Sequence, residues 1–107
     1  MFIHHDGKKV YNVTFVNQAL GLNKTIQVRD DQYILDAAEQ QGINLPVSCR
    51  TGMCINCAGR IVKGEVDQDH DFLKPKELEA GFLLTCKSYP LSDCVILTHQ
   101  EEELLDL

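Results

Sequence analysis

Five cysteines constrain the fold of this chain more than any other feature of its sequence. Three of them stand close together as Cys49-x4-Cys54-x2-Cys57, and Cys86 follows after 28 intervening residues. An odd number of cysteines fits poorly with a framework made only of disulfides, whereas this spacing fits a metal or cluster site. The fold must therefore bring a cysteine-rich loop and a distant segment together around one centre.

Four thiolates in this pattern are what a [2Fe–2S] cluster requires, with two sulfur ligands on each iron. Gly52 lets the backbone approach the inorganic sulfides, and N–H groups of the loop can stabilise the negative cluster. Zinc is the alternative, but four-cysteine zinc sites usually contain two C-x2-C pairs, and only Cys54 and Cys57 form one here. Cys94 lies in an apolar segment and is interpreted as a small buried hydrophobic residue.

The pattern of apolar residues predicts strands on both sides of one helix. Residues 10–16 and 24–29 alternate across a short gap, which predicts a hairpin. A helix is expected after Asp30-Asp31, which would cap it, and before Gly42, which would end it. Strands before and after a single helix, without a β-α-β rhythm, indicate an α+β fold with a mixed sheet and one long helix packed across it. The other expected elements are a loop over 46–57, strands over 59–64, 82–85 and 94–98, a short helix over 75–80 and a final turn at 101–104.

Length and charge limit the class of protein. A chain of 107 residues has room for one domain, which we place at residues 10–107 after an N-terminal extension of residues 1–9. The formal charge of −6 argues against nucleic acid or an anionic membrane surface and favours basic protein partners. No apolar stretch is long enough for a membrane span, and the first residues have no apolar run of a signal peptide. We therefore expect a monomer that is cytoplasmic or, if this is a mature plastid form, stromal.

Several segments together resemble one known family from about Val10 to Leu104. They read DDQYILDAAE from Asp30, LPVSCRTG from Leu45, CAG from Cys57, EAGFLLTC from Glu79 and SDCVILTHQEE from Ser92. In these segments the chain resembles the cyanobacterial and chloroplast ferredoxins, whereas adrenodoxin-like carriers usually have five residues between the first two ligands rather than four. The resemblance implies a β-grasp fold and electron transfer without a substrate site, through one [2Fe–2S] cluster with iron ligands Cys49, Cys54, Cys57 and Cys86.

The resemblance also implies partners and a docking surface. Photosystem I is the expected donor, and ferredoxin–NADP reductase and other soluble enzymes are the expected acceptors. The family docks through an aromatic side chain near the cluster, matched by Phe72, and through acidic side chains, matched by Asp36, Glu39, Glu101 and its neighbour Glu102. A solvated face for the acids and core packing for Phe72 are the alternatives.

Departures from the family pattern predict a specialised member. Lys74 and Lys76 stand where the family is rich in Asp, and the segment between Cys57 and Cys86 is one residue shorter than usual. We therefore expect weak use of ferredoxin–NADP reductase and a different acceptor. Met53 and Ile55, on either side of Cys54, replace smaller or hydroxyl-bearing residues, which predicts a reduction potential below that of a typical member. A regulatory protein that uses the state of the cluster as a signal is the alternative from another class.

Overall fold

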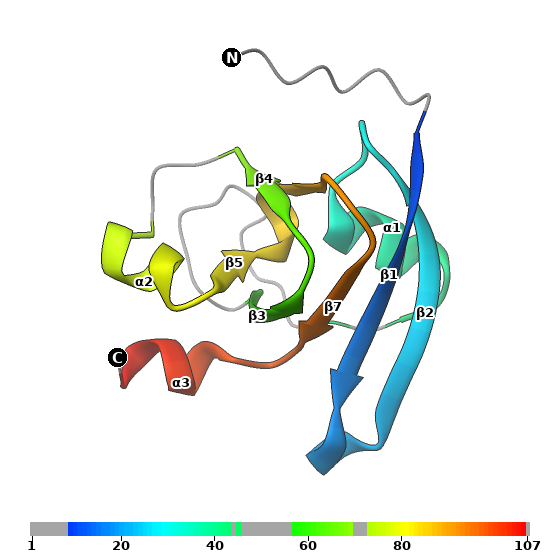
Figure 1. The fold of residues 1–107 in the computed structure, drawn as a ribbon. Coiled ribbons are helices and arrows are strands. Elements are labelled where there is room, and N and C mark those ends of the chain that lie inside the picture. Colours follow the sequence, from blue (N-terminus) through cyan, green and yellow to red (C-terminus); the bar gives the residue numbers. More distant parts are fainter. Residues whose placement is uncertain (1–8, 44, 46–56, 70–72, 107) are drawn as a thin grey trace.

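The described part of the chain forms two sheets and several short helices (Figure 1). The computed structural model describes residues 9–43, 45, 57–69 and 73–106. Their strands are β1 (Val10–Asn17), β2 (Leu22–Arg29), β3 (Ala58–Lys63), β4 (Val66–Gln68), β5 (Phe82–Leu84), β6 (Ser88–Pro90) and β7 (Cys94–Leu97). Their helices are α1 (Ile34–Gln40), α2 (Pro75–Glu79), α3 (Glu101–Leu105) and the 3-10 helices η1 (Gln18–Leu20) and η2 (Thr85–Lys87).

The predicted hairpin is confirmed. β1 and β2 pair antiparallel along their full length, and η1 joins them. Their alternating residues place one face of the hairpin in the core, and Gly21 closes η1 with a φ of 66°, a conformation that glycine adopts without a steric penalty. The buried residues of the hairpin face are Val13, Phe15, Ile26 and Val28.

The larger sheet is mixed, as the α+β prediction requires. Its strand order is β2-β1-β7-β3-β5, with β1 and β7 parallel and the other pairs antiparallel. β4 and β6 form a separate antiparallel pair that was not predicted, because strands of three residues are too short to show an alternation. The sheet therefore places the start of β3 and the end of β5 side by side, with Ala58 opposite Leu84.

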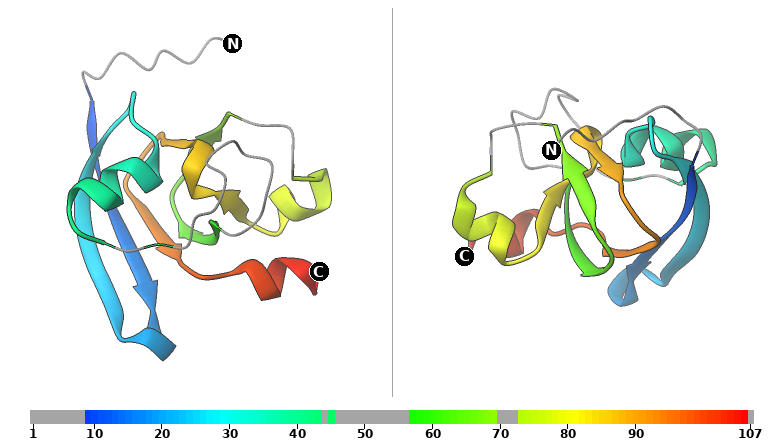
Figure 2. Two further views of the ribbon diagram at one scale, coloured as in Figure 1. Left: turned by 180° about the vertical axis from the view of Figure 1, so that it is seen from behind. Right: turned by 45° about the horizontal axis from the view of Figure 1, so that its top comes forward.

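The predicted helix is present as α1, and it is the longest helix among the described residues. It packs against β2, β6 and η2. Four of its apolar side chains are buried, and Figure 2 shows the helix from behind, beside the β1–β2 hairpin. The prediction that Asp30-Asp31 caps it is wrong, because the N-cap is Tyr33. Asp30 is buried, and its N–H donates to the carbonyl oxygen of Lys9 at 3.0 Å, so this residue continues the hairpin instead of starting the helix.

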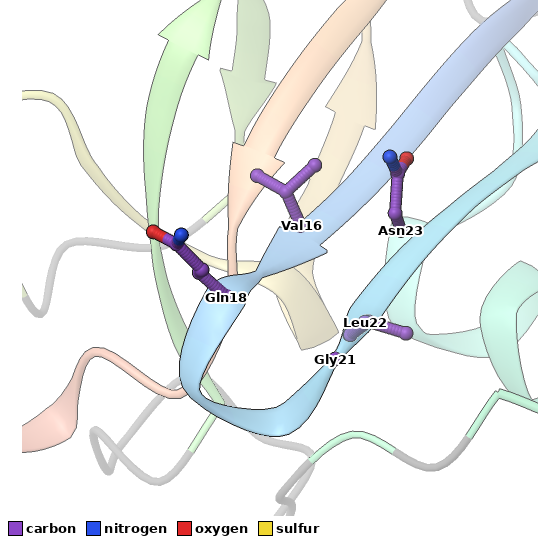
Figure 3. Close-up of a pocket in the computed structure, with 5 residues that line it drawn as sticks. All are labelled: Val16, Gln18, Gly21, Leu22 and Asn23. Atoms are coloured by element: carbon purple, nitrogen blue, oxygen red, sulfur yellow. The ribbon is translucent and has the colours of Figure 1, made fainter.

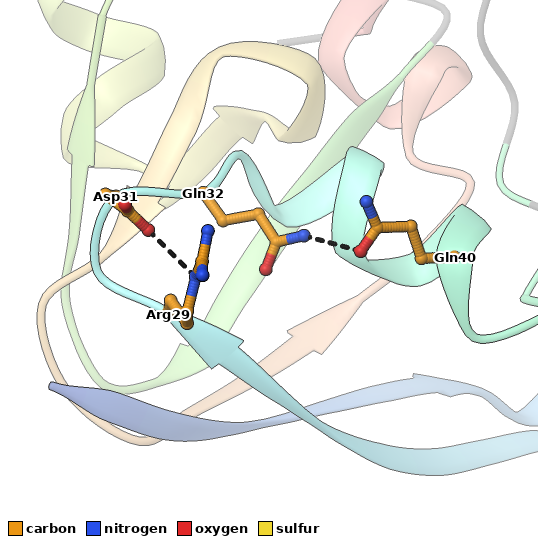
Figure 4. A network of polar contacts seen from close by, with 4 residues as sticks. All are labelled: Arg29, Asp31, Gln32 and Gln40. Atoms are coloured by element: carbon orange, nitrogen blue, oxygen red, sulfur yellow. Dashed lines mark hydrogen bonds and ion pairs between the residues drawn. The ribbon is translucent and has the colours of Figure 1, made fainter. Parts of the chain in front are cut away.

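Polar side chains join the end of the hairpin to α1 (Figure 4). Arg29 Nε lies 3.1 Å from Asp31 Oδ1, and Gln32 Nε2 donates to Gln40 Oε1 at 2.8 Å. These exposed contacts contribute little individually. They mark where the chain turns from β2 into the helix.

The two short elements predicted near the C-terminal end of the sequence are also present. α2 begins with Pro75, and the carboxylate of Glu77 accepts the backbone N–H of Lys74 at 2.7 Å, which caps the helix. α3 follows β7 after a short connection. Across the described ranges, no helix is long and apolar enough to cross a membrane.

Candidate metal centre

Two of the four predicted ligands lie in the described residues, and the fold brings them together. Cys57 directly precedes β3, and Cys86 is the central residue of η2, which follows β5. Because β3 and β5 pair at these ends, the two Sγ atoms lie 3.2 Å apart although the residues are 29 positions apart in the sequence. Both side chains are buried, and neither is in a disulfide.

Buried hydrogen bonds fix the turn that carries Cys86. The Oγ1 of Thr85 donates to the carbonyl oxygen of Cys57 at 2.9 Å, and the Thr85 N–H reaches the same oxygen at 3.4 Å. On the other side, Ser88 Oγ donates to the carbonyl oxygen of Leu84 at 2.7 Å. Thr85 and Ser88 are both buried, so these bonds form away from water and hold η2 against the start of β3.

The electrostatics of the pair favour a bound cation. The hydrogen bond with the Cys86 thiol lowers the pKa of Cys57 to about 6, although burial opposes this shift. Thiolates, not thiols, are the form of cysteine that binds metal. A buried thiolate beside a second cysteine sulfur is therefore a chemical fit for an iron ion.

Cys94 has a different environment. Its Sγ donates to the carbonyl oxygens of Glu65 and Ser92 at 3.3 and 3.2 Å, and burial raises the pKa of its thiol. The side chain therefore stays protonated and uncharged at the start of β7. This environment agrees with the interpretation of Cys94 as a small buried residue rather than a ligand.

The remaining predicted site residues fall into two groups. Cys49, Cys54 and Phe72 lie outside the described residues, as do Gly52, Met53 and Ile55 of the cysteine loop. The charged positions lie on the three helices: half-buried Asp36 and exposed Glu39 on α1, exposed Lys74 and Lys76 at α2, and half-buried Glu101 and exposed Glu102 on α3.

The helices divide these charges in space. α2 and α3 lie toward the same end of the molecule, whereas α1 lies toward the opposite end (Figures 1 and 2). The predicted docking acids therefore lie on two helices that are at opposite ends of the described part of the chain. α2, which carries the two lysines, lies nearer to α3 than to α1 (Figures 1 and 2).

An aromatic group beside η2 was not predicted from the sequence. The ring of Tyr33 stacks on Tyr89 with centroids 4.5 Å apart, and its hydroxyl donates to Asp69 Oδ2 at 2.7 Å. The ammonium nitrogen of Lys87 lies 4.7 Å from the centroid of the same ring. These contacts join segments that are far apart in the chain, so no local sequence pattern predicts them. The one feature that the sequence does show is that Lys87 directly follows the predicted ligand Cys86.

A surface pocket of about 320 Å³ lies elsewhere, at the turn of the β1–β2 hairpin (Figure 3). None of its lining residues belongs to the segments that carry the cysteines, and none is titratable. The lining residues are Val16, Gln18, Gly21, Leu22 and Asn23. This pocket offers no acid, base or nucleophile for a reaction.

Comparison with known proteins identifies close relatives. The family described as a 2Fe-2S iron-sulfur cluster binding domain matches residues 17–91. The vegetative ferredoxin of Trichormus variabilis is 47% identical over 96 residues, which are 89% of this chain and 97% of that protein. Chloroplastic ferredoxin-6 of Zea mays is 53% identical over 85 residues, which are 78% of this chain and 55% of that protein.

A solved structure shows the same architecture. The crystal structure of pectocin M2 superimposes with a TM-score of 0.82 at 45% identity, covering 90% of this chain. The matched region is 35% of the pectocin M2 chain, so this chain spans only about a third of that protein. At this identity the likeness extends to sequence as well as to fold.

Proposed function

Since this chain belongs to the plant-type [2Fe–2S] ferredoxins and is an electron carrier with one [2Fe–2S] cluster, we propose that it is a specialised member whose partners are selected by lysines at α2. Photosystem I or a reductase supplies its electrons, and ferredoxin-dependent enzymes accept them. Ferredoxin–NADP reductase is a weak acceptor. The carrier has no substrate site and uses no acid–base residues.

The buried sulfur pair carries the ligand assignment. Two sulfur ligands at about 2.3 Å from one tetrahedral metal lie about 3.8 Å apart. The Sγ atoms of Cys57 and Cys86, at 3.2 Å, need only a small separation to bind one iron. The sequence motif supplies the remaining two ligands, so that the full set is Cys49, Cys54, Cys57 and Cys86.

The chain's own residues position and shield this centre. The cluster supplies the one-electron chemistry when bound, and the protein supplies orientation and electrostatics. Thr85 keeps Cys86 against Cys57, and the burial of both cysteines excludes water from their sulfur atoms. This rigid support would limit the movement of the two cysteines when the bound cluster gains or loses one electron.

Serine substitutions test the ligand set. Each of the four variants Cys49→Ser, Cys54→Ser, Cys57→Ser and Cys86→Ser should fail to retain two irons and two acid-labile sulfides per chain. Cys94→Ser is the matched control and should retain both, because the Cys94 thiol donates to the backbone carbonyl oxygens of Glu65 and Ser92 and is not one of the four proposed ligands. Loss of the cluster in Cys94→Ser with retention in Cys86→Ser would refute the assignment.

Charge governs association with partners. The oxidised cluster with its four thiolates adds about two negative charges to the formal −6 of the chain, which steers it toward basic partners. We assign docking to the aromatic, acidic and basic positions Phe72, Asp36, Glu39, Glu101, Glu102, Lys74 and Lys76. The exposure of Lys74 and Lys76 supports this role for the lysines.

Lys74 and Lys76 determine which protein partners bind well. Each lysine in place of an acid changes the local charge by about two units, and like charges brought together at an interface oppose binding. A tenfold loss of affinity requires only about 1.4 kcal/mol, which a partly exposed pair of charges can supply. A basic partner that accepts standard ferredoxins therefore binds this chain less well.

A double charge reversal tests the selection. Lys74→Asp with Lys76→Asp should raise NADP reduction through ferredoxin–NADP reductase at low ionic strength, with photosystem I as donor. Lys24→Asp with Lys63→Asp changes the net charge equally at exposed positions on β2 and β3 and should have a smaller effect. Wild-type turnover already equal to that of a standard ferredoxin would refute the proposal. Failure to pass electrons to any acceptor enzyme would instead favour a regulatory role.

The domain and its location complete the proposal. The carrier domain spans residues 10–107, in agreement with the start of β1 at Val10. It acts as a monomer, in the cyanobacterial cytoplasm or the chloroplast stroma. The named relatives come from a cyanobacterium and a plant chloroplast, which supports these two locations.

A further inference from the structure

We propose that Lys87 sets the reduction potential of the cluster: its ammonium group, held over the ring of Tyr33, is a positioned positive charge beside Cys86 that makes the cluster easier to reduce. This inference rests on the ligand role of Cys86 given above. It concerns a residue that the cysteine motif does not include.

The position of Lys87 follows from the local structure. It is the last residue of η2 and directly follows Cys86, so their Cα atoms are about 3.8 Å apart. Cys86 is buried and Lys87 is half-buried. A lysine next to a ligand usually extends into water, where solvent screens its charge, but this side chain packs along the surface of the protein instead.

An aromatic pair holds the ammonium group. The Lys87 Nζ lies 4.7 Å from the centroid of Tyr33, within the range of a cation–π contact. Tyr33 is fixed in turn, because it is the N-cap residue of α1 and its ring stacks on Tyr89 of β6 at 4.5 Å with an interplanar angle of 24°. The main chain of Lys87 is also fixed, since its carbonyl oxygen accepts the N–H of Asp69 at 2.7 Å.

The carboxylate of Asp69 opposes the effect. The Asp69 carboxylate accepts the hydroxyl of Tyr33 at 2.7 Å, so it lies at the far edge of the same ring. Its negative charge offsets part of the field of Lys87. The ammonium group sits over the face of the ring. We therefore expect Asp69 to reduce the effect of Lys87 without cancelling it, and the Lys87→Gln variant reports the net effect.

Reduction adds one negative charge to the cluster. A nearby cation therefore stabilises the reduced state more than the oxidised state, and partial burial of the cation weakens its screening by solvent. Lys87→Gln removes the charge and keeps much of the side-chain length. We expect it to shift the reduction equilibrium about threefold toward the oxidised form, which is about 28 mV at 59 mV per tenfold change.

The test is a spectroelectrochemical titration of the holoprotein and its variants. Lys63→Gln is the matched control, because it removes the same charge from an exposed site at the far end of β3, up to about 20 Å of strand from Cys57. Lys87→Arg should keep the wild-type potential, and Tyr33→Leu should lower it by less than Lys87→Gln, since the charge remains but is no longer held. A shift in Lys87→Gln no larger than that in Lys63→Gln would overturn the proposal.

Iron and acid-labile sulfide analysis separates this result from a failure of the ligand assignment. A complete cluster in Cys86→Ala, which has no side-chain atom able to bind iron, would remove Cys86 as a ligand and would overturn the inference with it. A complete cluster in Lys87→Gln with an unchanged potential would overturn only the role of Lys87.

Discussion

Gly64 lies in the turn between β3 and β4, and its replacement by alanine should destabilise the domain strongly. Its φ is 99°, a value that residues with a side chain rarely adopt. A Cβ atom at this position would overlap the carbonyl oxygen of Asp93 and would lie 2.9 Å from Cys94 Cα and 3.0 Å from Cys94 Sγ. The neighbours are mostly backbone at the start of β7, so a side-chain rotation cannot relieve the overlap.

The expected cost has two parts. A left-handed conformation costs a residue other than glycine about 1–2 kcal/mol, and overpacking against a rigid neighbour costs about 1–3 kcal/mol more. Gly21 provides the matched control, because it has a φ of 66° but nothing within 4 Å of the added Cβ, so Gly21→Ala should cost only about 1 kcal/mol. At about 4–8 °C per kcal/mol, we expect Gly64→Ala to lower Tm by roughly 4–30 °C more than Gly21→Ala does.

Thermal unfolding of the two holoproteins, followed by far-UV circular dichroism, measures this difference. Iron analysis before each scan ensures that the cluster content is equal in both variants. Equal Tm values for Gly64→Ala and Gly21→Ala would refute the reasoning. Such a result would mean that the β3–β4 turn does not pack closely against the start of β7.

Three further predictions concern the site and its surroundings. Thr85→Val should cost about 1–3 kcal/mol and release iron faster in urea, because the buried carbonyl oxygen of Cys57 loses a donor; an unchanged rate of bleaching would contradict this. Burial raises the pKa of Tyr33 above its ordinary value, so the folded chain retains a proton that the unfolded chain loses, and the free energy of unfolding should fall as pH rises above about 10. In Tyr33→Phe the free energy of unfolding should decrease less steeply over this pH range. An identical pH profile for the variant and the wild type would exclude this role of Tyr33. Association with a basic partner should slow as salt increases, in stopped-flow measurements with photosystem I, whereas a constant rate would argue against electrostatic steering.

The regular part of the fold was predictable from the sequence because it follows simple periodicities. Alternation identified the hairpin through Val13, Phe15, Ile26 and Val28, all of which are buried. The helix start was misplaced because an acidic pair is a frequent N-cap, and the sequence does not show that Asp30 still bonds to Lys9 across the hairpin. β4 and β6 were missed because their pairing is purely tertiary.

The function was predictable because the cysteine spacing is specific. The comparisons confirm the family, the cluster and the role in electron transfer. The ligand set, the docking residues and the specialised partner stay predictions. Tyr33 and Lys87 were not recognised as neighbours, since no local pattern reports a contact between residues so far apart in the sequence.

The parallel pairing of β1 with β7 has a consequence for the order of biogenesis. Residues 13–16 pair with residues 94–97 in the larger sheet, so the central strand β7 joins β1 to β3 only after residues 94–97 have been made. Such non-local contacts form slowly, because closing the long loop between the two strands costs conformational entropy before their contacts stabilise the fold. We therefore expect a nascent chain that already displays all four proposed ligands to lack the sheet that holds β3 and η2 in place. Stable cluster insertion should then follow synthesis rather than accompany it.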